Sequence, residues 1–171
     1  KDLDEYEVRV KGNFPREGIV DDGGYAQLIK EADMNQIEPQ KFIGRVKLGV
    51  DPAGAGKNKT RWVGRDKYIA RVLAEEAISN GKGIAQKTLT LMSEFGIKPH
   101  DVYVDDFGEG SKTVQELALA GKAVRGVNTG STDVMDKRFL NRRAEIAWRC
   151  KDWLRAGGQL VRHLTWIQLL Y

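Results

Sequence analysis

The sequence is poor in the residues that form covalent cross-links or soft-metal sites. Its 171 residues include one cysteine, Cys150, and two histidines, His100 and His163. A lone cysteine excludes a disulfide framework within the chain and is typical of a reducing compartment. Two histidines are too few for a His-rich zinc site. We therefore expect neither a disulfide-stabilised scaffold nor zinc chemistry.

Long hydrophobic runs are also absent. No apolar stretch approaches the roughly 20 residues that cross a bilayer, and the opening KDLDEYEVRV does not have the pattern of a signal peptide. No membrane partner is expected. The chain begins without a methionine and closes on the apolar WIQLLY, so we expect both ends to be cuts through a longer polypeptide.

The composition is that of an ordinary folded domain. The hydrophobic content of 41% and charged content of 30% are typical of globular proteins, and the length allows one domain with a sizeable core. The formal net charge of +4 is compatible with a polyanionic partner without establishing one.

Two apolar runs in this chain each end abruptly on an aspartate. Residues 46–50 precede Asp51 and a glycine-rich loop, and residues 102–104 precede Asp105 within VYVDDFGEG. Alone, either aspartate is more typical of a loop or a helix cap, but the repeated pattern predicts two carboxylates side by side at one end of a sheet. Such carboxylates repel each other unless a cation lies between them, and Mg²⁺ and Mn²⁺ prefer oxygen ligands. Asp106 and Glu109 are further candidate ligands, although Asp106 is expected to point away from Asp105 in an extended segment.

The segment GAGKNKT matches a phosphate-binding loop only in part. In the pattern G-x-x-x-x-G-K-[ST], the first glycine position holds Asp51 and the Ser/Thr position holds Asn58. The following residues favour a strand rather than a helix that could hold phosphate at its N-terminus. We therefore predict no nucleotide site here. No nucleophile-elbow pattern appears either.

The pattern of hydrophobic residues predicts an α/β fold with a mixed five-stranded sheet flanked by helices. Three early strands with short links indicate antiparallel pairing, and later strand–helix–strand links favour parallel crossovers. Residues 1–43 are interpreted as a connecting extension with a weak alternation at 6–10 and a short helix, and 44–171 as the core. Strands are expected at 45–51, 59–64, 68–74, 102–104 and 123–127, and helices at 24–35, 83–95, from Ser111 to Gly121, and at 137–156 behind Asp133 or Asp136.

Three segments together resemble a known family. VKLGVDPAGAGKNKT, VYVDDFGEG and FLNRRAEIAWRCKDWLRAGG, in this order from about residue 44, resemble the nuclease domain of the large subunit of tailed-phage DNA-packaging terminases. EYEVRVKGNFP is similar to the segment that joins the packaging ATPase to that nuclease. The resemblance implies a ribonuclease H-like fold and an endonuclease that cuts concatemeric double-stranded viral DNA during genome packaging. It also implies the packaging ATPase domain of the same polypeptide, the portal and the small terminase subunit as partners, in the host cytoplasm.

The same resemblance implies roles for individual residues. Asp51 and Asp105 are similar to the first and second metal-ligating aspartates of the family, and they are the expected catalytic residues. Asn58 stands where the family often has aspartate, and its amide oxygen can still contact a metal or its water. The family normally has a further acidic motif that this sequence does not show, so we expect an incomplete site that binds divalent metal weakly.

The mechanism implied by the resemblance is phosphodiester hydrolysis with two divalent ions, Mg²⁺ or Mn²⁺, about 3.5–4 Å apart. Lys57, Lys59 and Arg61 beside the loop are expected to contact DNA phosphates, which positions DNA without reading its sequence. Arg142 is a further DNA-binding candidate on an arginine-rich helix face, although such faces are more often simply solvated. Two alternatives stay open: a structure-selective resolvase-type nuclease, and a catalytically silent nucleic-acid-binding or assembly module.

Overall fold

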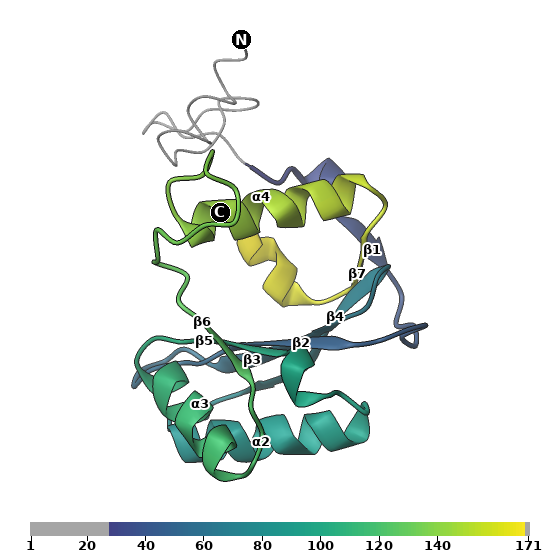
Figure 1. The fold of residues 1–171 in the computed structure, drawn as a ribbon. Coiled ribbons are helices and arrows are strands. Elements are labelled where there is room, and N and C mark those ends of the chain that lie inside the picture. Colours follow the sequence, from purple (N-terminus) through teal and green to yellow (C-terminus); the bar gives the residue numbers. More distant parts are fainter. Residues whose placement is uncertain (1–27, 170–171) are drawn as a thin grey trace. The chain divides into compact units, whose positions relative to one another are not determined.

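The computed structural model describes residues 28–169 (Figure 1). These residues divide into two compact units. Residues 38–128 form the sheet unit, and residues 28–37 and 129–169 form the described part of the terminal unit. The weak alternation at 6–10 lies outside the described residues. The division into an extension of 1–43 and a core of 44–171 stays a prediction.

The sheet is mixed, as predicted, but it has seven strands instead of the expected five. The sheet unit contributes the five strands that were predicted. The strand order is β4-β3-β2-β5-β6. β2 pairs with β3 and β3 with β4 in antiparallel fashion, whereas β2 with β5 and β5 with β6 are parallel. The strands are β2 (Lys47–Asp51), β3 (Thr60–Arg65), β4 (Ile69–Glu76), β5 (Val102–Asp105) and β6 (Arg125–Val127).

Two helices cover one face of this sheet, α2 (Gly81–Glu94) and α3 (Glu109–Leu119). Figure 1 shows both on the same side of the strands. β2 alternates buried and exposed residues, so that Leu48 and Val50 face the helices while Asp51 lies on the opposite face. The main core forms between this face and the helices; its fully buried members are Leu48, Trp62, Ile84, Val102, Val104 and Leu117.

The two helices begin differently. α2 begins after Asn80, whose side chain accepts a hydrogen bond from the Gly83 amide at 2.8 Å. α3 begins at Glu109, two residues before the expected cap Ser111, and Gly108 precedes it with a φ of 57°. The predicted cap is therefore wrong: the chain turns into the helix at a glycine, which adopts this backbone conformation without a steric penalty.

The terminal unit contains two strands that the sequence analysis did not predict. β1 (Asn35–Ile37) pairs in parallel with β7 (Gln159–Val161). The expected helix at 24–35 is wrong over its described part, which forms a short 3₁₀ turn, η1 (Glu31–Asp33), followed by β1. The Asn35 side chain donates to the carbonyls of Leu154 and Gly158, both at 3.2 Å, which ties β1 to the end of the helix α4 (Arg142–Arg155). A second 3₁₀ segment, η3 (Leu164–Leu169), follows β7.

The last long helix, α4 (Arg142–Arg155), is shorter than predicted. Residues 137–141 form turns, and Asn141 caps the helix by accepting a hydrogen bond from the Ala144 amide at 2.9 Å. Neither Asp133 nor Asp136 is the cap. Leu140 therefore precedes the helix and is 51% exposed, instead of packing on its inner side. The backbone amide of Arg142 donates to Ser131 at 2.8 Å, which holds the preceding loop against the helix start. No helix in the described part of the chain is both long and apolar enough to span a membrane.

Candidate metal and nucleic-acid site

The two aspartates singled out in the sequence lie at neighbouring strand ends. In the parallel pair β2–β5, Val50 is the register partner of Val104. Asp51 and Asp105 each follow their valine as the last strand residue. The structure thereby confirms their expected placement at one end of the sheet. Their chemical roles remain a proposal.

The two carboxylates influence each other electrostatically. Partial desolvation raises the pKa of Asp51, the charge of Asp105 raises it further, and Arg61 offsets part of the shift. Although Asp51 is exposed by surface area, the charged form of its carboxylate is thus destabilised in the folded chain. A cation bound between the two aspartates would relieve this destabilisation.

The loop between β2 and β3 is closed at its base by Thr60. The Thr60 side chain is fully buried, and its hydroxyl accepts a hydrogen bond from the Ala53 amide at 2.9 Å. The same hydroxyl donates to the Ile78 carbonyl at 2.5 Å. Lys57 and Asn58 lie between these closing contacts and are exposed. The loop therefore presents both side chains from a fixed base, beside Asp51.

The turn after Asp105 is tightly packed. The Asp106 amide donates to the Val127 carbonyl at 2.9 Å. A Cβ atom on Gly110 would lie 1.7 Å from the backbone oxygen of Asp105, so only glycine fits at the start of α3. A Cβ atom on Gly126 would lie 2.5 Å from Oδ2 of Asp106, which shows that this carboxylate lies over β6. As expected, Asp106 is directed away from Asp51.

Glu109 connects the two helices. Its carboxylate accepts a hydrogen bond from the Gly81 amide at 3.0 Å and pairs with Lys112 at 2.5 Å. The Lys112 side chain and the Gly81 amide hold the pKa of Glu109 below its usual range, although partial desolvation opposes this shift. Within residues 28–169, no group of three or more His, Cys, Asp or Glu side chains is arranged to hold a metal ion. The described site therefore rests on Asp51 and Asp105.

Two of the expected DNA-binding cations share a carboxylate that the sequence analysis missed. Lys59 Nζ lies 3.1 Å from Oε1 of Glu75, and Arg61 Nε donates to Oε2 of the same residue at 2.7 Å. Glu75 is the register partner of Arg61 on β4. The expected strand at 68–74 ended one residue too early to include it. The register of β3 with β4 also shifts between Trp62 and Val63, so the length of the predicted strands alone does not place Glu75 opposite Arg61.

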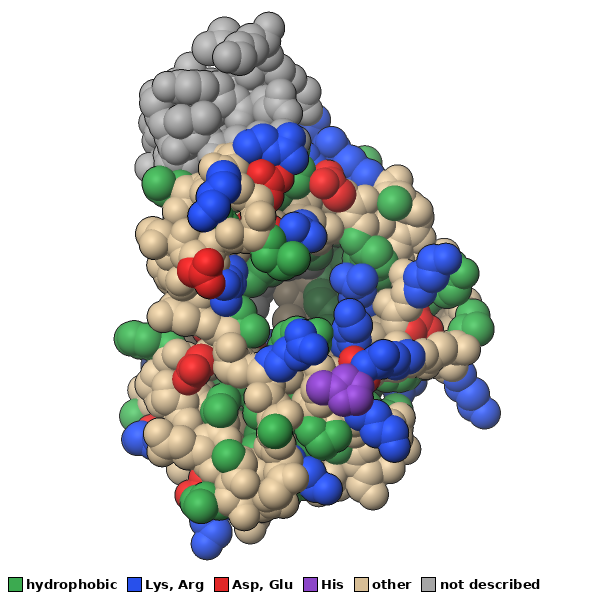
Figure 2. Space-filling model, viewed as in Figure 1, with side chains coloured by type: hydrophobic (Ala, Val, Ile, Leu, Met, Phe, Trp, Pro, Cys, Tyr) green, Lys and Arg blue, Asp and Glu red, His purple; other side chains and the backbone are tan. Residues whose placement is uncertain are grey.

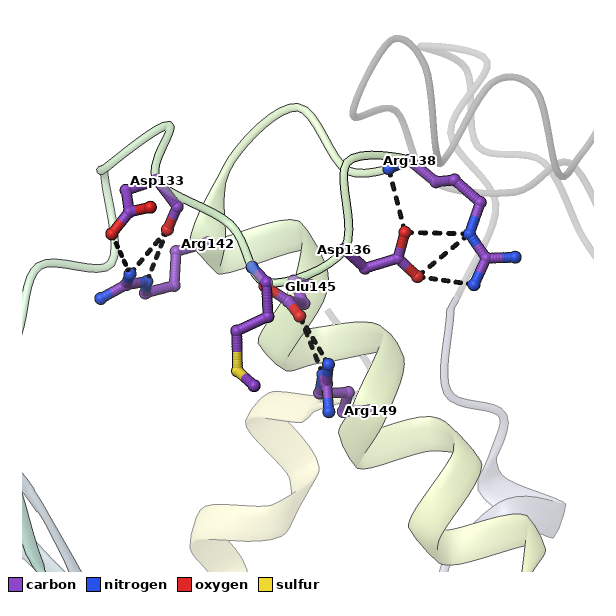
Figure 3. A network of polar contacts seen from close by, with 7 residues as sticks. Asp133, Asp136, Arg138, Arg142, Glu145 and Arg149 are labelled. Carbon is purple, nitrogen blue, oxygen red and sulfur yellow. Dashed lines mark hydrogen bonds and ion pairs between the residues drawn. The ribbon is translucent and has the colours of Figure 1, made fainter.

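Arg142 and its neighbours belong to a polar network in the terminal unit (Figure 3). The Arg142 guanidinium donates to the Asp133 carbonyl at 2.6 Å and pairs with the Asp133 carboxylate at 3.0 Å. Figure 3 also shows two further pairs, Arg138 with Asp136 and Arg149 with Glu145. Arg138 precedes α4, so the expected helix face with three arginines is not formed. A contact of Arg142 with DNA stays a prediction.

Further cations lie on the sheet face opposite the helices. Lys47 is the register partner of Arg65, and both side chains are exposed. On the other side of β2, Arg125 lies over the ring of Tyr103, with 5.5 Å from its guanidinium carbon to the ring centroid. Figure 2 shows Lys and Arg side chains close together on one part of the visible surface. The acid pair thus lies on a sheet face that otherwise carries mainly positive charge.

The chain has the fold of several solved nuclease domains. It is similar to the nuclease domain of the large terminase subunit gp2 of bacterial virus Sf6, with a TM-score of 0.50 and 21% sequence identity over 68% of this chain and 56% of that chain. Two mutant forms of the same terminase subunit are also similar to this chain. The form with manganese and beta-thujaplicinol has a TM-score of 0.50 and 19% sequence identity to this chain. The form with calcium has a TM-score of 0.51 and 21% sequence identity. Each match covers 67% of this chain and 55% of the terminase chain.

These matches confirm the predicted ribonuclease H-like α/β fold. The chain spans little more than half the length of the domains that it matches. No protein-family model matches the chain, and no curated protein sequence matches it.

Proposed function

We propose that this chain is the nuclease part of a phage terminase large subunit, which cuts double-stranded DNA with the help of divalent metal ions during genome packaging. The observation that supports it most directly is the pair Asp51 and Asp105 at the end of two parallel strands. The pair occurs in a fold shared with the nuclease domain of the Sf6 large terminase subunit. The fold alone would leave many functions open, so the proposal depends on this pair.

The donor atoms of the pair fit a hard divalent cation. Carboxylate oxygens are the ligands that Mg²⁺ and Mn²⁺ prefer. Partial desolvation and then the charge of Asp105 raise the pKa of Asp51, and a bound cation would oppose both effects. Asp51 and Asp105 would hold the metal, and Asn58 is a further candidate for direct or water-mediated contact. Asp106, whose carboxylate lies over β6, is not. Related structures contain manganese or calcium. Two bound ions would supply stabilisation of the attacking water and of the leaving oxygen.

The chain's own cations would hold the DNA backbone beside this pair. Lys57 is exposed in the loop after Asp51, Lys59 directly precedes β3, and Arg61 lies within β3. Contacts from these side chains to phosphate oxygens would position the duplex without reading its bases. Cutting would therefore be largely independent of sequence. The packaging ATPase domain of the same polypeptide, the portal and the small terminase subunit are the proposed partners, in the host cytoplasm.

A catalytically silent nucleic-acid-binding module is the second candidate. It is favoured by the observation that, within residues 28–169, only two acidic side chains meet at the proposed site. Mg²⁺ gives up its hydration water reluctantly, so a site with few anionic oxygens would hold it weakly. Such a module would bind DNA through the same cations and leave it intact.

Nicking of supercoiled plasmid separates the two candidates. The chain and a variant with both Asp51→Asn and Asp105→Asn would be compared in Mn²⁺, in Mg²⁺ and in excess chelator. We expect metal-dependent nicking by the unchanged chain and none by the double variant. Retained DNA binding without nicking by the unchanged chain would support the silent module instead. A preference for four-way junctions over linear duplex would indicate a resolvase-type enzyme.

A further inference from the structure

Arg61 on β3 has an acidic residue opposite it on each of the two neighbouring strands, and it forms an ion pair with only one of them. In the antiparallel registers, Arg61 is the partner of Asp51 on β2 and of Glu75 on β4. Directly opposed residues in antiparallel strands project from the same face. The three side chains therefore form one row across the sheet, with the cation in the middle. Arg61 Nε nevertheless donates to Glu75, at 2.7 Å.

Glu75 is the better hydrogen-bonding partner in this row. It is partly buried, with a side-chain exposure of 22%, equal to that of Arg61. Its second oxygen lies 3.1 Å from Lys59 Nζ, so one carboxylate holds two cations. Within the described residues, the Asp51 carboxylate has no ion pair and influences Arg61 only through its charge. Glu75 thus orients Arg61 away from the acid pair.

We propose that Glu75 is a positioning residue, which holds Arg61 away from Asp51 and so leaves Asp51 available to a divalent cation. This inference rests on the metal site of the proposed function. A guanidinium is a strong competitor for a carboxylate, because its planar array of donors matches the two oxygens. If Glu75 were neutral, the opposed Asp51 would be the acid within reach of Arg61. An Arg61–Asp51 pair would then occupy an oxygen that the metal needs.

Glu75 acts in this proposal through Arg61 and not as a metal ligand. Neighbouring strands are about 4.8 Å apart, and β3 lies between β4 and β2. Glu75 is therefore two strands away from Asp51, and both of its oxygens are engaged with Lys59 and Arg61.

Mn²⁺ binding by the chain, measured by titration calorimetry or by loss of the free-ion EPR signal, tests the proposal. Glu75→Gln should weaken binding about fivefold, the strength of a typical partly exposed ion pair. Arg61→Gln should not weaken it, and the double variant should bind as Arg61→Gln does. Glu76→Gln is the matched control. It removes the same charge one residue away, from a carboxylate that pairs with Lys87 and not with Arg61. Equal weakening by Glu75→Gln with and without Arg61 would overturn the proposal.

A second measurement needs no metal. The stability of the metal-free chain in urea would be compared for Asp51→Asn in the unchanged and the Glu75→Gln backgrounds. We expect the small stabilisation by Asp51→Asn in the unchanged chain to be lost in the Glu75→Gln background, because only there does Asp51 pair with Arg61. The same effect in both backgrounds would show that Arg61 has not moved, and would refute the positioning role. Absence of Mn²⁺ binding by the unchanged chain, with this coupling present, would instead contradict the proposed function.

Discussion

Asp51 and Asp105 end two parallel strands side by side, each one residue beyond a buried valine of the same register pair. The valines anchor the strand ends in the core, so the two carboxylates are held close together although they repel each other. Partial desolvation, together with this repulsion, raises the pKa of Asp51. The folded chain therefore maintains an unfavourable charge pair that a bound cation would stabilise.

Asp51→Asn should stabilise the metal-free chain at neutral pH. Because the pKa of Asp51 in the folded state is raised above the ordinary 3.8, protonation favours folding. This contribution is fully present below pH 3.8 and is lost as pH rises through the folded-state pKa. At pH 7 the variant should gain on the order of 0.5 kcal/mol, since solvent screens an exposed charge. Urea denaturation at pH 7 and pH 3 measures the difference.

Asp152→Asn, which neutralises an exposed carboxylate in the terminal unit, is the control for this measurement. The gain of Asp51→Asn should shrink toward zero at the lower pH, whereas the control should show no comparable trend. An equal gain at both pH values would contradict the repulsion between Asp51 and Asp105.

Lys57→Gln should weaken binding of unrelated duplex sequences about equally. Lys57 is exposed in the loop after Asp51, and DNA bound without its charge would release one counterion fewer. The slope of log K against log salt should therefore fall by about one unit. Fluorescence anisotropy of labelled duplexes across a salt series measures the slope. Lys122→Gln, at the far end of α3, should leave the slope unchanged; equal slopes for both variants would argue against a DNA contact by Lys57.

Gly110→Ala should disrupt the end of β5. The added Cβ atom would lie 1.7 Å from the backbone oxygen of Asp105, so the strand end or α3 must shift. We expect a loss of about 2–4 kcal/mol, in the range of severe steric substitutions, together with weaker Mn²⁺ binding. Gly54→Ala is the control, because no atom lies within 4 Å of its added Cβ. Unchanged stability of Gly110→Ala would show that the turn adapts.

Asp66→Ala should destabilise the β3–β4 turn. The buried Asp66 carboxylate accepts hydrogen bonds from the amides of Tyr68, Ile69 and Ile43, at 2.7, 2.8 and 2.8 Å. Burial opposes ionisation, but these backbone hydrogen bonds prevail and lower the pKa of Asp66. We expect a loss of about 2–3 kcal/mol, because three amides lose their acceptor.

The stabilisation by Asp66 is present above its ordinary pKa of 3.8 and is lost as pH falls through the lower folded-state value. Denaturation from pH 7 down to pH 2 should therefore bring the unchanged chain and Asp66→Ala closer together. A constant difference over this range would mean that the charge of Asp66 does not matter. Asp66→Asn, which keeps one acceptor oxygen, should lose less than Asp66→Ala at pH 7.

Local patterns in the sequence were sufficient for the sheet and for the acid pair. Apolar alternation and short links predicted three antiparallel strands, and strand–helix–strand links predicted parallel crossovers later in the chain. The repeated pattern of an apolar run that ends on aspartate predicted that β2 and β5 end side by side. Once that pairing holds, two strands that each end on aspartate bring Asp51 and Asp105 together. The signal is strong because it depends only on strand period and crossover direction.

Elements that depend on distant partners were not predictable in this way. β1 has three residues and pairs with β7 near the other end of the described chain, so neither strand has a local pattern of its own. The start of α4 was misplaced because both Asp133 and Asp136 are acceptable caps by residue type. Backbone hydrogen bonds from Arg142 and Arg143 to the 129–131 loop leave Asn141 at the helix start.

The sequence by itself determined that Asp51, Asp105 and Arg61 come near one end of the sheet, because two strands end on aspartate and Arg61 follows the loop after Asp51. Glu75 lay beyond the predicted strand. Only the tertiary structure decided how they pair. Arg61 has an acid on either side, and its choice of Glu75 depends on partial burial and on Lys59 sharing the same carboxylate. This pairing depends on hydrogen-bond geometry across three neighbouring strands, and the spacing of residues along the sequence does not specify that geometry.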